Sequence, residues 1–557
     1  MSHPSQSPPS PAATGLPSSL RLQLPTARLA PNSKGWKRIE SRIPPLLRPL
    51  VRAYLLGYVS SVAPRLFTLI SKQALRWKAG KKQQDGFVES FVNILRGGMD
   101  WHRFPTFCAV LAGGSTLLEY CYSLQALGFL QNYTRSFSRH IVPCRTKTAS
   151  IRSSSFKDML LTLDHYRLSR SFASFIAAWL GIKLLQSKRT PGFTETISSP
   201  TVISVETPLP TSDAVLDQRQ EVSPKQPPRT VHYAGRTLDL TLFAVTRALD
   251  VIFGELWSHY KARRHGSPST TASSRLVEPL ISRLTDPAIF ALSSALIMWT
   301  WFYHPSRLPR AYNKWITSAA AVDSRLIEAL RRCRAGSLVY GKDTGQAPLL
   351  GSMCKDYDWP EAWGDPAKAV PFPCEIVHMG CGPSCERHAL SRFALSFKWA
   401  FTMYLPLNLL LVLRKPNWKA LKRALVSACG SSAFLGVFIT LFYYGVCLAR
   451  TRLGPYIVGR DVKGCQKMDG GLCVGTGCAL CGWSILLENA GRRKDMALFV
   501  APRALATLFP RRYDLRKQWR EAAVFAASTA VVFTCALENP KRVRGVLGGV
   551  LAGVLKP

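Results

Sequence analysis

The sequence is poor in acidic residues, with 33 Asp and Glu against 73 Lys and Arg, and its formal net charge is +40. No acidic residue precedes Glu40. The basic residues flank apolar blocks and do not alternate with aromatic residues on one face, so the pattern argues against nucleic acid as a partner. Arg and Lys occur beside apolar blocks where loops meet a membrane surface. The charge therefore predicts a lipid bilayer and anionic lipid headgroups as partners.

A secretory signal and a disulfide framework are also missing. Residues 1–48 are basic and rich in Pro and Ser, without an apolar core segment, and we expect them to form a disordered tail. The 15 cysteines are an odd number in a long chain, and several lie inside apolar blocks, so we expect reduced thiols.

Familiar enzyme motifs are absent as well. The sequence contains no GxSxG or HExxH motif. The stretch from Gly336 to Lys342 fits GxxxxGK, but Asp343 follows where a phosphate-binding loop needs Ser or Thr, and Pro348 lies where its helix should begin. The sequence therefore predicts a protein that is not an enzyme and that requires no cofactor.

Long apolar blocks dominate what is present. Blocks near the ~20 residues needed to cross a bilayer lie at 104–122, 171–186, 286–303, 391–413, 428–449, 471–487 and 521–537, with weaker candidates at 50–70, 238–257, 496–509 and 545–555. The sequence predicts an all-α, multi-pass integral membrane helical bundle. Polar insertions at 131–168 and 188–232 interrupt a first half at 49–339, and a linker at 340–373 precedes a second half at 391–557.

The two halves contain matching segments. Residues 236–253 align without gaps on 492–509, with eight identical positions, and 290–307 align on 525–542 in the same order. Two matches in one order predict an internal repeat and therefore two related halves. Repeats of this kind build many transporters and pores, with the site between the halves. The alternative is that duplication only enlarged a helical bundle.

Charged residues recur within the matched segments. Asp239, Arg247 and Asp250 share one broad helical face, and Asp495 and Arg503 repeat the first two. Ionisable groups at membrane depth face the protein interior and pair there, which predicts Arg247 with Asp250 and, more loosely, Arg503 with Asp495. In the alternative interpretation both segments are amphipathic helices at the interface and the charges are solvated.

Metal-ligand residues are densest at 374–390. Cys374, His378, Cys381, Cys385 and His388 lie within fifteen residues, which offers the ligand types of a tetrahedral zinc site. The alternatives are a structural role in capping the following helix and thiol chemistry. A second group lies in a Gly-rich apolar run, where we expect the thiols to act as packing residues: Cys465, Cys473, Cys478 and Cys481.

The Cys/His segment also carries a family resemblance. The run from Cys374 to His378, the following Pro383-Ser384-Cys385 and a helix ending at 404–410 resemble the Cys-rich region of the transmembrane protein 135 family. Residues 484–494 and about 285–345 are similar to other helices of that family.

The resemblance implies a non-enzymatic multi-pass protein of the mitochondrial or peroxisomal membrane. Its implied role is in lipid handling or organelle homeostasis, with other organelle membrane proteins as partners. It also implies a distant similarity to the mitochondrial inner-membrane translocase and to small peroxisomal membrane proteins. The internal repeat leaves a second function open, namely a transporter or pore for a small metabolite or a lipid.

Overall fold

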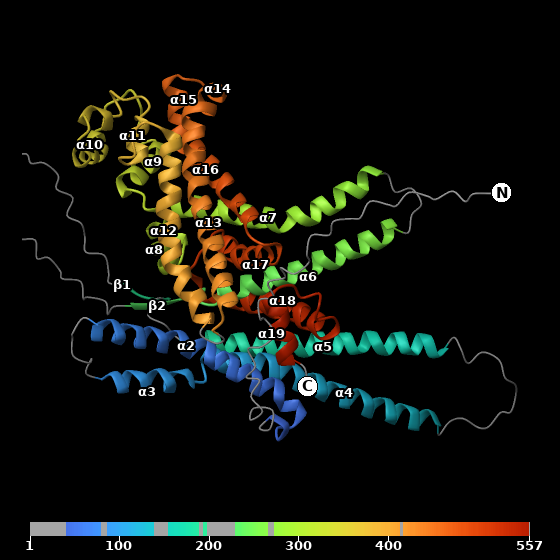
Figure 1. Ribbon diagram of the computed structural model, residues 1–557. Helices are drawn as coiled ribbons and strands as arrows, with labels where there is room; N and C mark the ends of the chain where they lie inside the picture. The colour runs from blue at the N-terminus through green and yellow to red at the C-terminus, as the bar shows by residue number, and fades with distance from the viewer. Residues whose placement is uncertain are drawn as a thin grey trace, which may run out of the picture.

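A computed structural model describes residues 40–78, 86–138, 154–188, 193–197, 229–265, 272–412 and 416–555. The described chain is largely helical, which confirms the all-α prediction (Figure 1). Most of the predicted N-terminal tail and the central parts of the two polar insertions lie outside the described residues.

The first half of the chain contains most of the long helices that lie across the lower part of Figure 1. Its elements are α2 (Arg48–Lys78), α3 (Phe87–Gly98), α4 (Phe104–Ser138), α5 (Ser154–Gln186), β1 (Thr194–Ile197), β2 (Arg229–Ala234), α6 (Leu238–His265), α7 (Ala272–Tyr303), α8 (Arg310–Ala320) and α9 (Ser324–Ala335).

The second part begins with short helices and continues with an upright pair. Its elements are α10 (Ala347–Asp356), α11 (Cys374–His378), α12 (Cys385–Val412), α13 (Trp418–Leu448), α14 (Gly454–Ile457), α15 (Val462–Lys467), α16 (Cys473–Cys481), α17 (Ala490–Ala506), β3 (Tyr513–Asp514), α18 (Gln518–Glu538) and α19 (Val546–Leu555). Two π-helical turns, η5 (Ala449–Leu453) and η6 (Met468–Leu472), interrupt the helices between α13 and α16.

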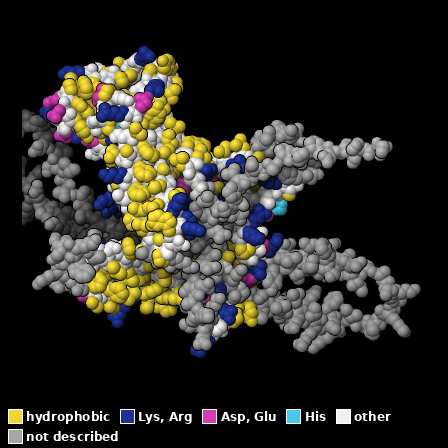
Figure 2. All heavy atoms as spheres, viewed as in Figure 1, with side chains coloured by type: hydrophobic (Ala, Val, Ile, Leu, Met, Phe, Trp, Pro, Cys, Tyr) yellow, Lys and Arg dark blue, Asp and Glu magenta, His cyan; other side chains and the backbone are white. Residues whose placement is uncertain are grey.

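Six helical segments of the described chain are long and apolar enough to cross a membrane: 45–73, 167–186, 278–303, 418–457, 462–487 and 515–538. They contain five of the predicted strong spans and the weaker one at 50–70. Large apolar side chains are exposed on these helices and on α12; Val426 is 64% exposed and Leu407 58%. Hydrophobic side chains run along the α12–α13 face in Figure 2. Such a surface suits hydrocarbon better than water.

The segment at 340–373, predicted to be a linker, is folded. Four of its side chains are at most 3% exposed and belong to the main hydrophobic core: Tyr340, Leu350, Met353 and Phe372. Apolar residues spaced for one face of α10 allow this segment to bury its own surface, so it forms a compact lobe with α9 and α11 at one end of α12 and α13, and α8 lies beside α12 (Figure 1).

The matching sequence segments fall on corresponding helices that pack together. The first copy covers α6 and α7, and the second covers α17 and α18. α6 packs against α17 and α18, and α17 packs against α7. Exposure also recurs at matched positions, because Leu242 and Leu498 are both buried whereas Phe253 and Phe509 are both exposed.

A small sheet, which the sequence patterns did not indicate, lies beside these helices. Its three antiparallel strands have the order β1-β2-β3, with Glu195 opposite Val231 and Ala234 opposite Tyr513. It joins the strand before α6 to the strand before α18.

Candidate metal centre and apolar cavity

The Cys/His segment is a short helix followed by a tight reversal of the chain. Cys374 and His378 are the first and last residues of α11, and Cys385 begins α12. Between them Gly380 and Gly382 have φ values of 88° and 85°, a left-handed conformation that glycine adopts without steric cost. The reversal brings the first turn of α12 back onto α11.

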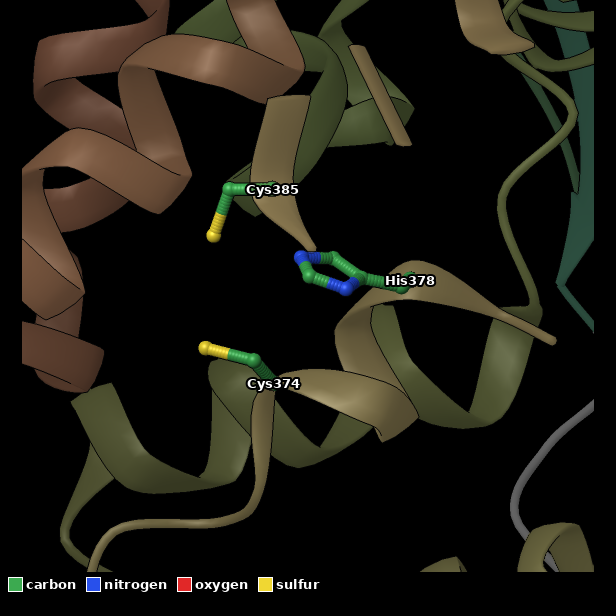
Figure 3. A group of neighbouring side chains, drawn as sticks. All are labelled: Cys374, His378 and Cys385. Atoms are coloured by element: carbon green, nitrogen blue, oxygen red, sulfur yellow. The ribbon is translucent and has the colours of Figure 1, made fainter. Parts of the chain in front are cut away.

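Three of the five predicted ligands come together in this reversal. The ligand atoms of Cys374, His378 and Cys385 all lie within 4.8 Å of one another. The two thiols point toward each other and the His378 imidazole lies beside them (Figure 3). His378 is fully buried, whereas the two cysteines are half-buried. Burial raises the pKa of the Cys374 thiol above its usual value, because a thiolate is poorly solvated there.

The other two predicted ligands have different surroundings. The Cys381 thiol lies 3.5 Å from the Ser391 hydroxyl, to which it donates. The fully buried His388 ring stacks on His378, with the ring centroids 4.6 Å apart. Burial, with Arg392 and His378 nearby, lowers the pKa of His388 to about 3, so this imidazole is neutral. His388 therefore packs against the ring of His378 and is not one of the three ligand residues that come together.

A third thiol, which we did not predict as a ligand, lies next to this group. Cys447 Sγ lies 3.5 Å from His378 Nε2. Cys447 belongs to α13, 69 residues further along the chain, and lies in an apolar block where a cysteine is usually a packing residue. Spacing along the sequence therefore gave no signal for it, and only the packing of α13 against α12 brings it to the site.

A buried ion pair lies next to this group. Arg450, in the π-helical turn η5, donates two hydrogen bonds of 2.6 and 2.8 Å to Asp469 in the turn η6. The two side chains are only 5% and 1% exposed. Tyr340 donates a third hydrogen bond, of 2.5 Å, to Asp469, and Arg450 donates to the Phe372 carbonyl. The network thus joins the lobe to α13 and α16.

The second cysteine group is buried in the way that we expected of packing residues. Cys473, Cys478 and Cys481 are at most 2% exposed and belong to the main core. Cys465 is half-buried.

An apolar cavity of about 440 Å³ lies between the two upright helices and the matched segments. It is lined by residues of α7, α8, α12, α13 and α17, which are Phe290, Ser294, Ile297, Met298, Tyr312, Trp315, Ile316, Ala319, Ala320, Tyr404, Phe434, Leu435, Phe438, Ile439, Met496, Phe499 and Val500. Only Ser294, Tyr312 and Tyr404 bring side-chain oxygen atoms to this wall. The cavity could not be predicted from the sequence, because the residues that line it come from five separate helices.

The predicted inward charges pair differently from our expectation. Asp250 pairs with Arg544, whose Nε is 2.9 Å from Asp250 Oδ1, and Arg544 also reaches Asp286 at 3.2 Å. Arg247 donates to the Arg544 carbonyl over 3.1 Å, and Asp495 Oδ1 accepts from the backbone N–H of Val546 over 3.2 Å. The chain after α18 thus supplies the partners, which a pattern within one helix could not show. Asp239 pairs instead with Arg511.

Arg503 lies apart from these charges, beside the cavity. Its guanidinium lies 3.6 Å from the ring centroid of Phe499, a lining residue, and it donates to the Phe499 carbonyl over 2.6 Å. Burial raises the pKa of the hydroxyl of Tyr312, another lining residue, and the nearby Arg503 charge opposes that rise. The cavity therefore has apolar walls with one half-buried cation close by.

No family model, curated protein or solved structure matches the chain.

Proposed function

We propose that this integral membrane protein binds a lipid and holds its acyl chain in the apolar cavity. The observation that carries this proposal is the cavity itself, and two of its five lining helices, α7 and α13, are candidate membrane spans. Its volume of about 440 Å³ falls within the ~300–1,000 Å³ typical of small-molecule sites.

The lining supports an apolar ligand. Aromatic and aliphatic side chains from five helices make up almost the entire wall. A buried polar ligand would lose its hydrogen bonds to water and find few replacements there. A hydrocarbon chain loses none, and it gains contact with the wall because burial of apolar area is favourable.

Arg503 supports an anionic headgroup. A guanidinium binds carboxylate and phosphate with two parallel hydrogen bonds, and at present this side chain donates to a carbonyl of its own helix. Its position beside Phe499 would place a headgroup outside the apolar walls. This division of the site agrees with the role in lipid handling that the family resemblance implies.

We also propose that the chain is a relative of the transmembrane protein 135 family and acts, without catalysing a reaction, in a mitochondrial or peroxisomal membrane. The resemblance of the Cys-rich segment and of the helices after it supports this. Imaging of a tagged full-length chain against mitochondrial and peroxisomal markers tests it. A signal on neither organelle would contradict the assignment.

A lipid carrier is the second candidate function, favoured by the packing of the matched helices. We propose that α6–α7 and α17–α18 are two copies of one unit, because an arginine that follows each copy forms a polar contact with the other copy. Arg307, after α7, donates to the Thr507 carbonyl at the end of α17 over 3.4 Å, and its match Arg542 pairs with Glu255 on α6 at 3.0 Å. The cavity lies where α7 of one copy meets α17 of the other, which is where repeat transporters bind substrate.

The experiment is a binding titration of detergent-purified protein with a fluorescent long-chain fatty acid and with the matching fatty alcohol. Ala319→Phe fills the cavity and should weaken binding of both ligands at least tenfold, which is ~1.4 kcal/mol. Ala527→Phe adds the same group at an exposed position of α18 and is the control.

The headgroup is tested by Arg503→Gln, which should weaken binding of the fatty acid roughly tenfold to a hundredfold, as expected for loss of a charge-assisted hydrogen bond, and leave binding of the alcohol unchanged. Arg516→Gln, at an exposed arginine, is its control. Wild-type binding by Ala319→Phe would refute the proposal. Lipid exchange between vesicles distinguishes a carrier from a binding protein, since Arg247→Leu and Arg503→Leu should slow only a carrier.

A further inference from the structure

We propose that Cys374, His378, Cys385 and Cys447 bind one Zn²⁺ ion in a tetrahedral Cys₃His site. The four donors come from α11, α12 and α13, so the ion would join the lobe to a candidate membrane helix. This inference is independent of lipid binding, because none of the four residues lines the cavity.

The spacing of the donor atoms carries the proposal. In a tetrahedral site with Zn–S near 2.3 Å and Zn–N near 2.0–2.1 Å, sulfur and nitrogen ligands lie about 3.6 Å apart. The observed distance from Cys447 Sγ to His378 Nε2 is 3.5 Å. Cys374, His378 and Cys385 are within 4.8 Å of one another, and Cys447 has the thiols of Cys385 and Cys374 among its nearest ionisable groups. Three donors therefore lie within 4.8 Å of one another, and the fourth reaches the group through His378 Nε2.

The orientation of His378 is also that of a ligand. Its Nδ1 lies 2.7 Å from the Gly382 carbonyl, which only accepts, so Nδ1–H is the donor. In the neutral tautomer with Nδ1–H, Nε2 is the free ligand atom, and it lies 3.5 Å from Cys447 Sγ. Metal-bound histidines almost always donate their second ring N–H to a carbonyl or carboxylate in this way, which fixes the tautomer.

The donor set selects zinc and a structural role. Three thiolates and one imidazole suit Zn²⁺ and disfavour Mg²⁺ and Ca²⁺, which prefer oxygen ligands. Binding would displace three thiol protons to solvent, and Arg450, one turn after Cys447, is the nearby cation. Four protein ligands leave no position for substrate. His388 and Tyr443 close one side, with their rings 5.2 Å apart.

The direct test is the metal content of the full-length chain, purified in detergent after expression with zinc and passed through chelator-free gel filtration. We expect one zinc per wild-type chain by elemental mass spectrometry. Cys447→Ser should lower the affinity at least tenfold in competition with a chromophoric chelator. Cys381→Ser, which removes a thiol from the same segment, should retain one zinc.

A second measurement uses only wild-type protein, in case Cys447→Ser does not fold. Replacement of zinc by Co²⁺ should give the charge-transfer and ligand-field bands of tetrahedral cobalt with three thiolates. A wild-type chain with far less than one zinc, an equal loss in Cys381→Ser, or a spectrum without thiolate bands would overturn the proposal. Two fewer free thiols in denaturant without reductant would show a disulfide instead, which also overturns it.

Discussion

Replacing Asp469 by Asn should loosen the attachment of the lobe to the upright helices. The carboxylate is 1% exposed and accepts hydrogen bonds from Arg450 and Tyr340. Asn removes the negative charge and leaves the Arg450 guanidinium buried without a counter-charge. Breaking a buried pair in this way costs about 3–5 kcal/mol. At about 1.4 kcal/mol per factor of ten, local opening should become roughly 10² to 4 × 10³ times more frequent.

Labelling of Cys354 measures this opening. That thiol is fully buried in the lobe, on α10, and does not belong to the ion-pair network. When reclosing is fast, the rate at which an uncharged maleimide labels it is proportional to the opening equilibrium. Peptide mass spectrometry separates Cys354 from the other cysteines. We expect the labelling rate of Asp469→Asn to rise by the factor given above.

Two controls separate charge burial from a general effect. Asp461→Asn makes the same substitution at an exposed carboxylate in the neighbouring turn, where Asn can still cap α15, and should change the rate little. Replacement of the whole network by Arg450→Met, Asp469→Leu and Tyr340→Phe should recover much of the lost protection, because no buried charge or unpaired hydroxyl remains. A labelling rate in Asp469→Asn within threefold of wild type would refute this reasoning.

Two further predictions concern a helix cap and a close helix contact. Asp323 caps α9, and hydrogen bonds from Arg325 hold the pKa of its carboxyl below the usual value. Its contribution to stability is therefore present above the unfolded pKa of ~4 and is lost as pH falls through the lower folded value. Asp323→Asn keeps the cap and should make the melting temperature of the lobe depend less steeply on pH in acid, and an unchanged pH dependence would contradict this. Gly477→Ala places a methyl group 2.6 Å from the Phe442 carbonyl between α13 and α16 and should cost about 1–3 kcal/mol in thermal melting. Gly430→Ala, with open space around it, should cost nothing, and equal melting of the two variants would count against tight packing there.

The arrangement within the Cys/His segment was partly predictable. Ligand residue types, two glycines and a following helix indicated that five residues of this segment could meet, and three of them, Cys374, His378 and Cys385, do. The chain reversal decides which members of the segment meet. His388, one helical turn beyond Cys385, stacks on the ring of His378. Cys447 could not be predicted, because its approach depends on the docking of α13.

Hydropathy and the 3.6-residue period are local properties, and they were enough to predict a helical chain that is apolar enough to enter a membrane. The partners of the charges, the lining of the cavity and the approach of Cys447, the third thiol, to the Cys/His group were decided only by tertiary structure. Each joins residues from helices far apart in sequence, such as Asp250 with Arg544. Their proximity is the result of packing between several helices at once, and no single segment carries that information.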